Sequence, residues 1–288
     1  MLDRYGREID YIRISVTDRC NFRCIYCMPE EGVPMVPHQE ILSYDEITEL
    51  AEIFADLGIR KIKLTGGEPL VRRGLPSLVK KLKSVRGSEK VTLTTNGVFL
   101  ADLLGELKEA GIDGINLSLD TLDPEVFARI TRRRELEKVL EGLHEAMKYP
   151  EISLKINCVP LGWKEQDILS MAELARKYPV HVRYIEMMPI GLGRQFAPVG
   201  EEELLELLEK RYGKSRPCNK KLGNGPASYN SFSGFLGKIG FLSARSQRFC
   251  GNCNHIVTPS HGLFNTFPHV VTWYDFKNTR WEAHGRVR

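Results

Sequence analysis

Three cysteines lie within eight residues near the amino terminus: Cys20, Cys24 and Cys27. Thiolates are the usual ligands of iron–sulfur clusters and of structural zinc, and closed sites of both kinds usually have four protein ligands. Three thiolates can hold three corners of a 4Fe–4S cluster and leave its fourth iron open. We therefore expect a cluster whose open position takes a substrate or a cofactor.

Four further cysteines bring the total to seven, an odd number that does not favour a disulfide framework. Cys250 and Cys253 form a second close pair, so that five of the seven fall in two clusters. In a chain without an export signal, such clusters indicate metal sites. Cys158 and Cys218 stand alone, and we interpret them as buried or incidental thiols.

Short apolar segments alternate with amphipathic segments from about residue 10 to residue 187, which predicts six successive β–α units. Such a series forms a parallel sheet, either as an open six-unit barrel or as a doubly wound sheet. The first helix is expected to begin at a capping box formed by Ser43 and Glu46. The predicted strands are residues 10–16, 61–65, 91–95, 114–119, 153–159 and 180–186.

Polar and glycine-rich motifs follow directly after several of these strands. The carboxyl ends of parallel strands meet at one edge of a sheet, where α/β active sites are built. We therefore expect a single site that joins the cysteine loop to the other motifs. These motifs are residues 65–69, 94–97, 118–120 and 187–189.

The cysteine loop and the glycine motif resemble those of the radical S-adenosylmethionine (radical SAM) superfamily. The resemblance rests on the spacing of the three cysteines, on Tyr26 just before the third, and on Gly-Gly-Glu-Pro at 66–69. Longer segments resemble the GTP 3′,8-cyclase family of that superfamily, whose members begin molybdenum-cofactor biosynthesis. They are residues 13–21, 64–70, 223–227 and 248–254, within a resemblance that runs from about residue 3 to 254.

This resemblance implies an α/β protein with a partial (β/α)6 barrel of the TIM type, a small carboxyl-terminal extension and lyase activity. A 4Fe–4S cluster on the first three cysteines would bind S-adenosylmethionine through its open iron. One-electron reduction would release a 5′-deoxyadenosyl radical, which abstracts the C3′ hydrogen of GTP before C3′ bonds to C8. The residues implied for S-adenosylmethionine are Tyr26, Gly67, Ser118 and Met188.

The implied substrate is GTP, and the residues implied for it are Arg13, Lys63, Thr94 and Lys155. The basic ones lie in strands that helices are expected to bury, where an unpaired charge is costly. An anionic ligand would pair them, and Arg183 is a further candidate of the same kind. The net charge of +4 also suits an anionic small molecule and is too small to predict nucleic-acid binding.

The resemblance also implies partners, namely a reductant such as flavodoxin or ferredoxin and the next enzyme of the pathway, cyclic pyranopterin monophosphate synthase. We expect a monomer or a homodimer. Because no apolar segment reaches the about 20 residues of a membrane span and the amino terminus does not resemble a signal peptide, we expect a cytoplasmic protein. The expected domains are a core barrel at 1–190, an extension with the second cysteine pair at 191–254, and an atypical tail at 255–288.

The tail departs from the family's pattern. The family's second cluster has a third cysteine about a dozen residues after its cysteine pair, where this chain has Phe267, and His255 and Val257 replace two arginines. Three interpretations stay open: a corrupted, frameshifted or truncated tail, a diverged paralogue that no longer makes the cyclic product, or a third ligand from His255, His261 or His269. Otherwise the pair binds nothing or forms half of a zinc site.

Two alternative functions accompany the cyclase hypothesis. One is a radical SAM paralogue that acts on a peptide or on another small molecule. The other is a zinc-binding or scaffold protein without catalysis. GTP binding separates the cyclase from the first alternative, and the iron and sulfide content of the protein separates it from the second.

Overall fold

The computed structural model describes residue 2, residues 6–220, 222–243 and 254–260, and the backbone of 263–264 and 274–275. Its main element is a ten-stranded sheet. The central strands run parallel to one another, each beside its neighbour in the chain. They are β1 (Tyr11–Ser15), β2 (Lys61–Thr65), β3 (Lys90–Thr95), β4 (Gly114–Ser118), β5 (Ser153–Cys158) and β6 (His181–Ile185).

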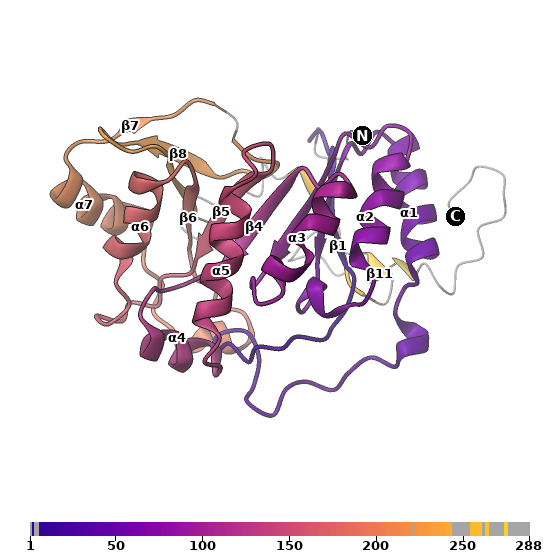
Figure 1. The fold of residues 1–288 in the computed structure, drawn as a ribbon, viewed down its shortest axis with the longest axis horizontal. Helices are drawn as coiled ribbons and strands as arrows, with labels where there is room; N and C mark the ends of the chain where they lie inside the picture. The colour runs from indigo at the N-terminus through magenta and orange to yellow at the C-terminus, as the bar shows by residue number, and fades with distance from the viewer. Residues whose placement is uncertain are drawn as a thin grey trace.

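The strand order decides between the two architectures that the sequence allowed. In a doubly wound sheet the order in which strands are added reverses beside the first strand. Here the spatial order of β1 to β6 follows the chain without such a reversal. The result is the open barrel. Figure 1 shows α1, α2, α3, α5 and α6 in chain order along one face of the sheet. The helices are α1 (Tyr44–Asp56), α2 (Leu75–Ser84), α3 (Leu100–Glu109), α4 (Pro124–Thr131), α5 (Leu136–Met147) and α6 (Ile168–Lys177).

The alternation of side chains along each strand separates an apolar face from a polar one. Ile12 and Ile14 of β1 and Leu64 of β2 are fully buried in the core beneath the helices. Successive strand residues point to opposite faces, so Arg13 and Lys63 face the concave side of the sheet. The capping box at the start of α1 is confirmed: the Glu46 amide donates to Ser43, and the Glu46 carboxylate accepts from the Ser43 amide.

Residues beyond the sixth unit extend both edges of the same sheet. β9 (Ile239–Leu242) pairs in parallel with β6, and antiparallel β8 (Ser228–Ser231) and β7 (Arg216–Pro217) follow it. At the other edge, β10 (His255–Thr258) pairs in parallel with β1. The remaining elements are α7 (Glu201–Tyr212), β11 (Leu263–Phe264), β12 (Tyr274–Asp275) and the 3₁₀ turns His38–Glu40, Pro69–Val71 and Gly191–Gln195.

Among the residues that the structure describes, none of the helices combines the length and apolar character needed to cross a bilayer.

Candidate active site at the strand ends

The cysteine loop follows β1 and folds on itself. The amides of Cys27 and Met28 both donate to the Cys24 carbonyl, at 2.9 and 3.0 Å, which closes a turn between the second and third cysteines. The Phe22 amide donates to the sulfur of Cys20 (3.4 Å). All three thiols are free of disulfides, and that of Cys27 belongs to an exposed residue. The loop therefore presents three unpaired thiols at the carboxyl edge of the sheet.

The three thiols lie close enough to influence one another. Burial raises the pKa of all three, and the charges of Cys27 and Cys20 contribute to the raised pKa of Cys24. Crowded, partly buried thiolates need cations, and a bound metal deprotonates its thiol ligands. No three described His, Cys, Asp or Glu side chains converge on a single metal ion. A 4Fe–4S cluster does not require this, because each cysteine binds a different iron.

The glycine pair after β2 lets two backbones approach. The Gly67 amide donates to the Thr17 carbonyl (2.7 Å), next to the cysteine loop. A Cβ on Gly67 would lie 2.2 Å from the Arg19 carbonyl oxygen, and one on Gly66 would lie 2.5 Å from that of Thr17. Any side chain at these positions would therefore push the two loops apart. This close packing explains the glycines, and the contact of Gly67 with S-adenosylmethionine stays a prediction.

Glu68 fixes the glycine loop to the end of β3. Its side chain is buried (1% exposed) and accepts hydrogen bonds from the Thr95 hydroxyl (2.7 Å) and from the amides of Asn96 (2.6 Å) and Leu70 (3.0 Å). Burial raises its pKa to about 7. The Asn96 side chain in turn donates to that of Asn21 in the cysteine loop (2.7 Å). Glu68 thus connects the glycine loop to the end of β3. The sequence analysis quoted Glu68 only as part of a motif and did not assign this role.

Tyr26 has a hydrogen-bond partner at the end of β4. Its hydroxyl donates to Asp120 Oδ2 (2.7 Å), and the Val159 amide donates to Asp120 Oδ1 (2.8 Å). Gln166 also donates to the Asp120 carbonyl (3.0 Å). Burial raises the pKa of Asp120 to about 6. The hydroxyl of Tyr26 therefore anchors the cysteine loop to the ends of β4 and β5, while the contact of Tyr26 with S-adenosylmethionine stays a prediction.

The other two residues predicted for S-adenosylmethionine lie at ends of strands of the same sheet. Ser118 is the last residue of β4, and Met188 follows β6. The structure thus places Tyr26, Gly67, Ser118 and Met188 on segments that leave the carboxyl ends of four parallel strands. Their contacts with a cofactor stay predictions.

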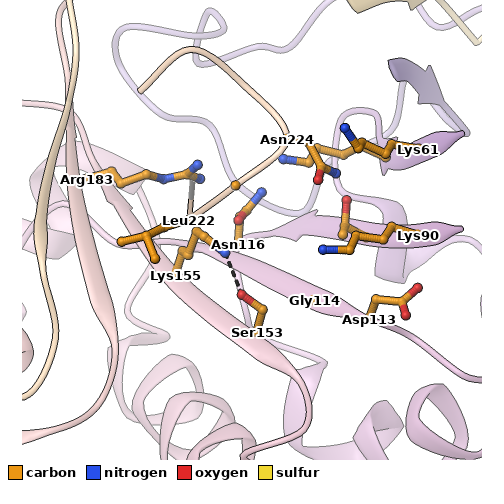
Figure 2. Close-up of a pocket in the computed structure, with 13 residues that line it drawn as sticks. Lys61, Lys90, Asp113, Gly114, Asn116, Ser153, Lys155, Arg183, Leu222 and Asn224 are labelled. Carbon is orange, nitrogen blue, oxygen red and sulfur yellow. Dashed lines mark hydrogen bonds between the residues drawn. The ribbon is translucent and has the colours of Figure 1, made fainter. Parts of the chain in front are cut away.

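A strongly basic cavity opens on the concave side of the sheet (Figure 2). It contains Lys63 and Lys155 of the predicted GTP set, together with Arg183. Burial, followed by the charges of Arg183 and Arg13, holds the pKa of Lys63 well below its usual value. Burial together with Arg183 lowers the pKa of Lys155 to about 8. The negative charge around these two ammonium groups is too small to balance their positive charge. A cavity with this excess of positive charge is suited to binding an anion.

The remaining predicted GTP residues lie beside this cavity. Arg13 pairs in register with Lys63, and Thr94 accepts a hydrogen bond from Asn116 (3.4 Å). Sequence reasoning missed Lys61 and Lys90, which also line the cavity at the amino ends of β2 and β3. The alternation of residues along the strands could have identified them, because both lie on the same face of the sheet as Lys63.

The segment 222–224 passes along the cavity beside Lys155 and Arg183 (Figure 2). A Cβ on Gly223 would lie 3.6 Å from Lys155 Cε and 4.0 Å from Arg183 Nη1. The side chain of Asn254 donates to the Asn224 carbonyl (2.9 Å) and to Asp10 Oδ1 (2.6 Å). This segment, which the sequence analysis singled out within residues 223–227, therefore forms one wall of the basic cavity.

Comparison with known proteins connects these features. Residues 14–175 match the model of the Radical SAM superfamily, and residues 180–266 match that of Molybdenum Cofactor Synthesis C. The GTP 3′,8-cyclase of Syntrophomonas wolfei is 46% identical over 266 residues, which are 91% of this chain and 81% of that protein. That of Desulforamulus reducens is 39% identical over an alignment of 290 positions, gaps included, which covers 99% of this chain and 89% of the relative. The chain belongs to the GTP 3′,8-cyclase family of the radical SAM superfamily.

A solved structure supports the radical SAM fold. The crystal structure of Streptococcus suis SuiB bound to S-adenosylmethionine matches with a TM-score of 0.67 at 12% identity and covers 95% of this chain. The matched region is 64% of the SuiB chain. At this identity the likeness concerns the fold alone, and it agrees with the partial barrel predicted from the sequence.

The departure from a second cluster stays a prediction, because most of its residues are not described. Cys250, Cys253, His261, Phe267 and His269 lie outside the described residues. His255 and Val257, at the two positions where the family resemblance implies arginine, pair in register with Tyr11 and Arg13 of β1. Both therefore face the basic side of the sheet. Burial and the charges of Arg13 and Lys63 lower the pKa of His255 to about 4, which leaves the ring neutral at pH 7.

Proposed function

We propose that this chain is a GTP 3′,8-cyclase, which opens molybdenum-cofactor biosynthesis by joining C3′ of GTP to C8 of its guanine. The observation that carries the proposal is the identity of 46% with a GTP 3′,8-cyclase over 91% of the chain. The geometry supports it, because the cysteine edge and the basic cavity belong to one sheet.

The residues of the site divide the work between them. Cys20, Cys24 and Cys27 would hold three irons of a 4Fe–4S cluster. When bound, the cluster and S-adenosylmethionine supply reductive bond cleavage and the abstraction of a hydrogen atom. Glu68 and Asp120 hold the loops around the cysteines in place through buried hydrogen bonds.

The basic cavity would bind the triphosphate of GTP. Lys63, Lys155 and Arg183 supply its positive charge, and Asn157 orients Arg183 by accepting a hydrogen bond from its Nε (3.0 Å). Phosphate oxygens accept strong charge-assisted hydrogen bonds from such groups. Binding there would also relieve the repulsion between the buried cations.

The number of clusters and the partners form part of the same proposal. One cluster forms on the first three cysteines, and Cys250 and Cys253 provide an incomplete second site. An external one-electron donor of the flavodoxin or ferredoxin type reduces the cluster. The product passes to cyclic pyranopterin monophosphate synthase.

The test is anaerobic reconstitution with iron and sulfide, followed by reaction with S-adenosylmethionine, dithionite and GTP. We expect about four irons per chain for one cluster, 5′-deoxyadenosine, and a cyclised GTP product identified by mass spectrometry. Cys24→Ala is the control and should yield neither product. Zinc without sulfide would contradict the proposal, and 5′-deoxyadenosine without GTP binding would indicate a different radical SAM substrate.

A further inference from the structure

Helix α4 ends in an unusual backbone conformation. Its C-cap residue, Arg132, has φ 56° and ψ 30°, in the left-handed region, and it is the one non-glycine residue with positive φ among those described. Glycine usually occupies such positions because a Cβ is disfavoured there. A strained residue that the surrounding structure holds in place indicates a task for its side chain.

The Arg132 side chain reaches the cysteine loop. Its Nη1 donates to the Arg23 carbonyl (2.7 Å) and to the Met28 carbonyl (3.2 Å). Cys24 and Cys27 lie between these two carbonyls in the sequence. One guanidinium therefore joins both ends of the segment that carries the second and third cysteines.

The last turn of α4 supports the same loop through its backbone. The amides of Arg23 and Ile25 donate to the carbonyls of Thr131 (3.0 Å) and Ile130 (2.9 Å). Arg133 Nε donates to the Asn21 carbonyl (3.1 Å). Figure 1 shows α4 beside the segment that follows β1. The end of α4 thus holds the cysteine loop through several hydrogen bonds.

We propose that Arg132 is a positioning residue for the cluster, and that its left-handed backbone aims its guanidinium across the cysteine loop so that the thiols of Cys24 and Cys27 keep the spacing that a cluster requires. The inference rests on the proposed function. Arg132 itself is not assigned a contact with the substrate or with S-adenosylmethionine.

Three variants separate this role from general stability. Arg132→Gly removes the guanidinium and relieves the backbone strain. Arg132→Lys keeps the positive charge and the strained backbone but replaces the planar fork with a compact ammonium on a shorter reach. Arg134→Gln is the matched control, because Arg134 is exposed (74%), pairs with Glu125 at 2.7 Å and makes no hydrogen bond to the loop in the described structure.

The first measurement is amide hydrogen exchange of the metal-free protein. We expect the amides of Cys27 and Met28 to exchange at least tenfold faster in Arg132→Gly and Arg132→Lys than in the wild type or in Arg134→Gln. The second measurement is the rate at which a chelator removes iron from the reconstituted protein, which we expect to rise at least threefold in both Arg132 variants. The melting temperature of metal-free Arg132→Gly should not fall below that of Arg134→Gln.

Wild-type exchange and iron-loss rates in both Arg132 variants would overturn the inference. A lower melting temperature in Arg132→Gly together with faster exchange throughout the barrel would also overturn it, because the role would then be structural. If Arg132→Gly does not fold, Arg132→Lys decides alone. If the wild type assembles no iron–sulfur cluster, the proposed function fails. The exchange rates of the loop amides in the metal-free Arg132 variants, compared with the wild type, still decide whether Arg132 holds the loop.

Discussion

At the scale of single residues, the close approach of two loops makes Gly67 sensitive to any side chain. Gly67→Ala would place its Cβ against the backbone of Arg19, which cannot move without shifting the cysteine loop. We expect a loss of about 1–3 kcal/mol in the free energy of unfolding, measured by urea denaturation. Gly105→Ala is the control, because Gly105 lies in α3 with nothing within 4 Å of the added Cβ. That change should be neutral or stabilise by up to about 1 kcal/mol. Equal effects of the two substitutions would contradict the packing argument.

Lys155 gives GTP binding a predicted pH dependence. Its pKa is lowered to about 8 in the free cavity, and a bound phosphate would raise it again. Through Lys155, binding then takes up a proton above pH 8, so the contribution of Lys155 to the affinity should be level below pH 8 and fall as the pH rises above it, by at most about tenfold per pH unit. Calorimetry between pH 7 and pH 9 measures this. Lys155→Gln should weaken binding and flatten the profile, whereas Lys80→Gln, at an exposed position on α2, should change neither. An unchanged slope in Lys155→Gln would assign the proton to another group.

At the scale of elements, Glu68 joins the loop after β2 to the end of β3. Glu68→Gln keeps the size of the side chain but replaces one acceptor oxygen with an NH2 group. In either orientation this NH2 group faces another hydrogen-bond donor, a backbone amide or a hydroxyl, and at least one hydrogen bond is lost. A buried group left without its partner costs about 1–3 kcal/mol, so we expect a loss of that size in urea denaturation. Glu52→Gln, on the exposed face of α1, should have little effect. Full stability of Glu68→Gln would mean that these strand ends are held by packing alone.

The sequence predicted the six central strands well because their apolar residues alternate with residues of the concave face. Ile12 and Ile14 show the pattern, and the capping box at Ser43 marks the first helix through purely local chemistry. The pairing of β10 with β1 could not be predicted, since it joins segments about 240 residues apart and depends on which edge is open. The left-handed conformation of Arg132 was also hidden, because the sequence shows no glycine there to indicate it.

At the scale of the whole molecule, the basic residues of the predicted GTP site lie on the concave face of the sheet. The sequence analysis placed the cysteines and the strand-end motifs on one edge because parallel strands share their direction. It identified Lys63 and Lys155 from a family resemblance, and strand alternation places Lys61 and Lys90 on the same face without showing that they line the same cavity. Strand alternation alone gives the face on which a side chain lies and not how far it is from the opposite wall.

The edge formed by β10 allows a direct test of how charge on this face controls GTP binding. Val257 is partly exposed (36%), pairs in register with Arg13 and occupies a position where the family resemblance implies arginine. Val257→Arg should tighten GTP binding at least fivefold at low salt, and the gain should shrink at high salt as the charges are screened. Calorimetry at two salt concentrations measures both effects. Leu207→Arg, on the exposed side of α7, adds the same charge elsewhere. An equal gain in Leu207→Arg would show that net charge attracts GTP and that the position beside Arg13 has no special role.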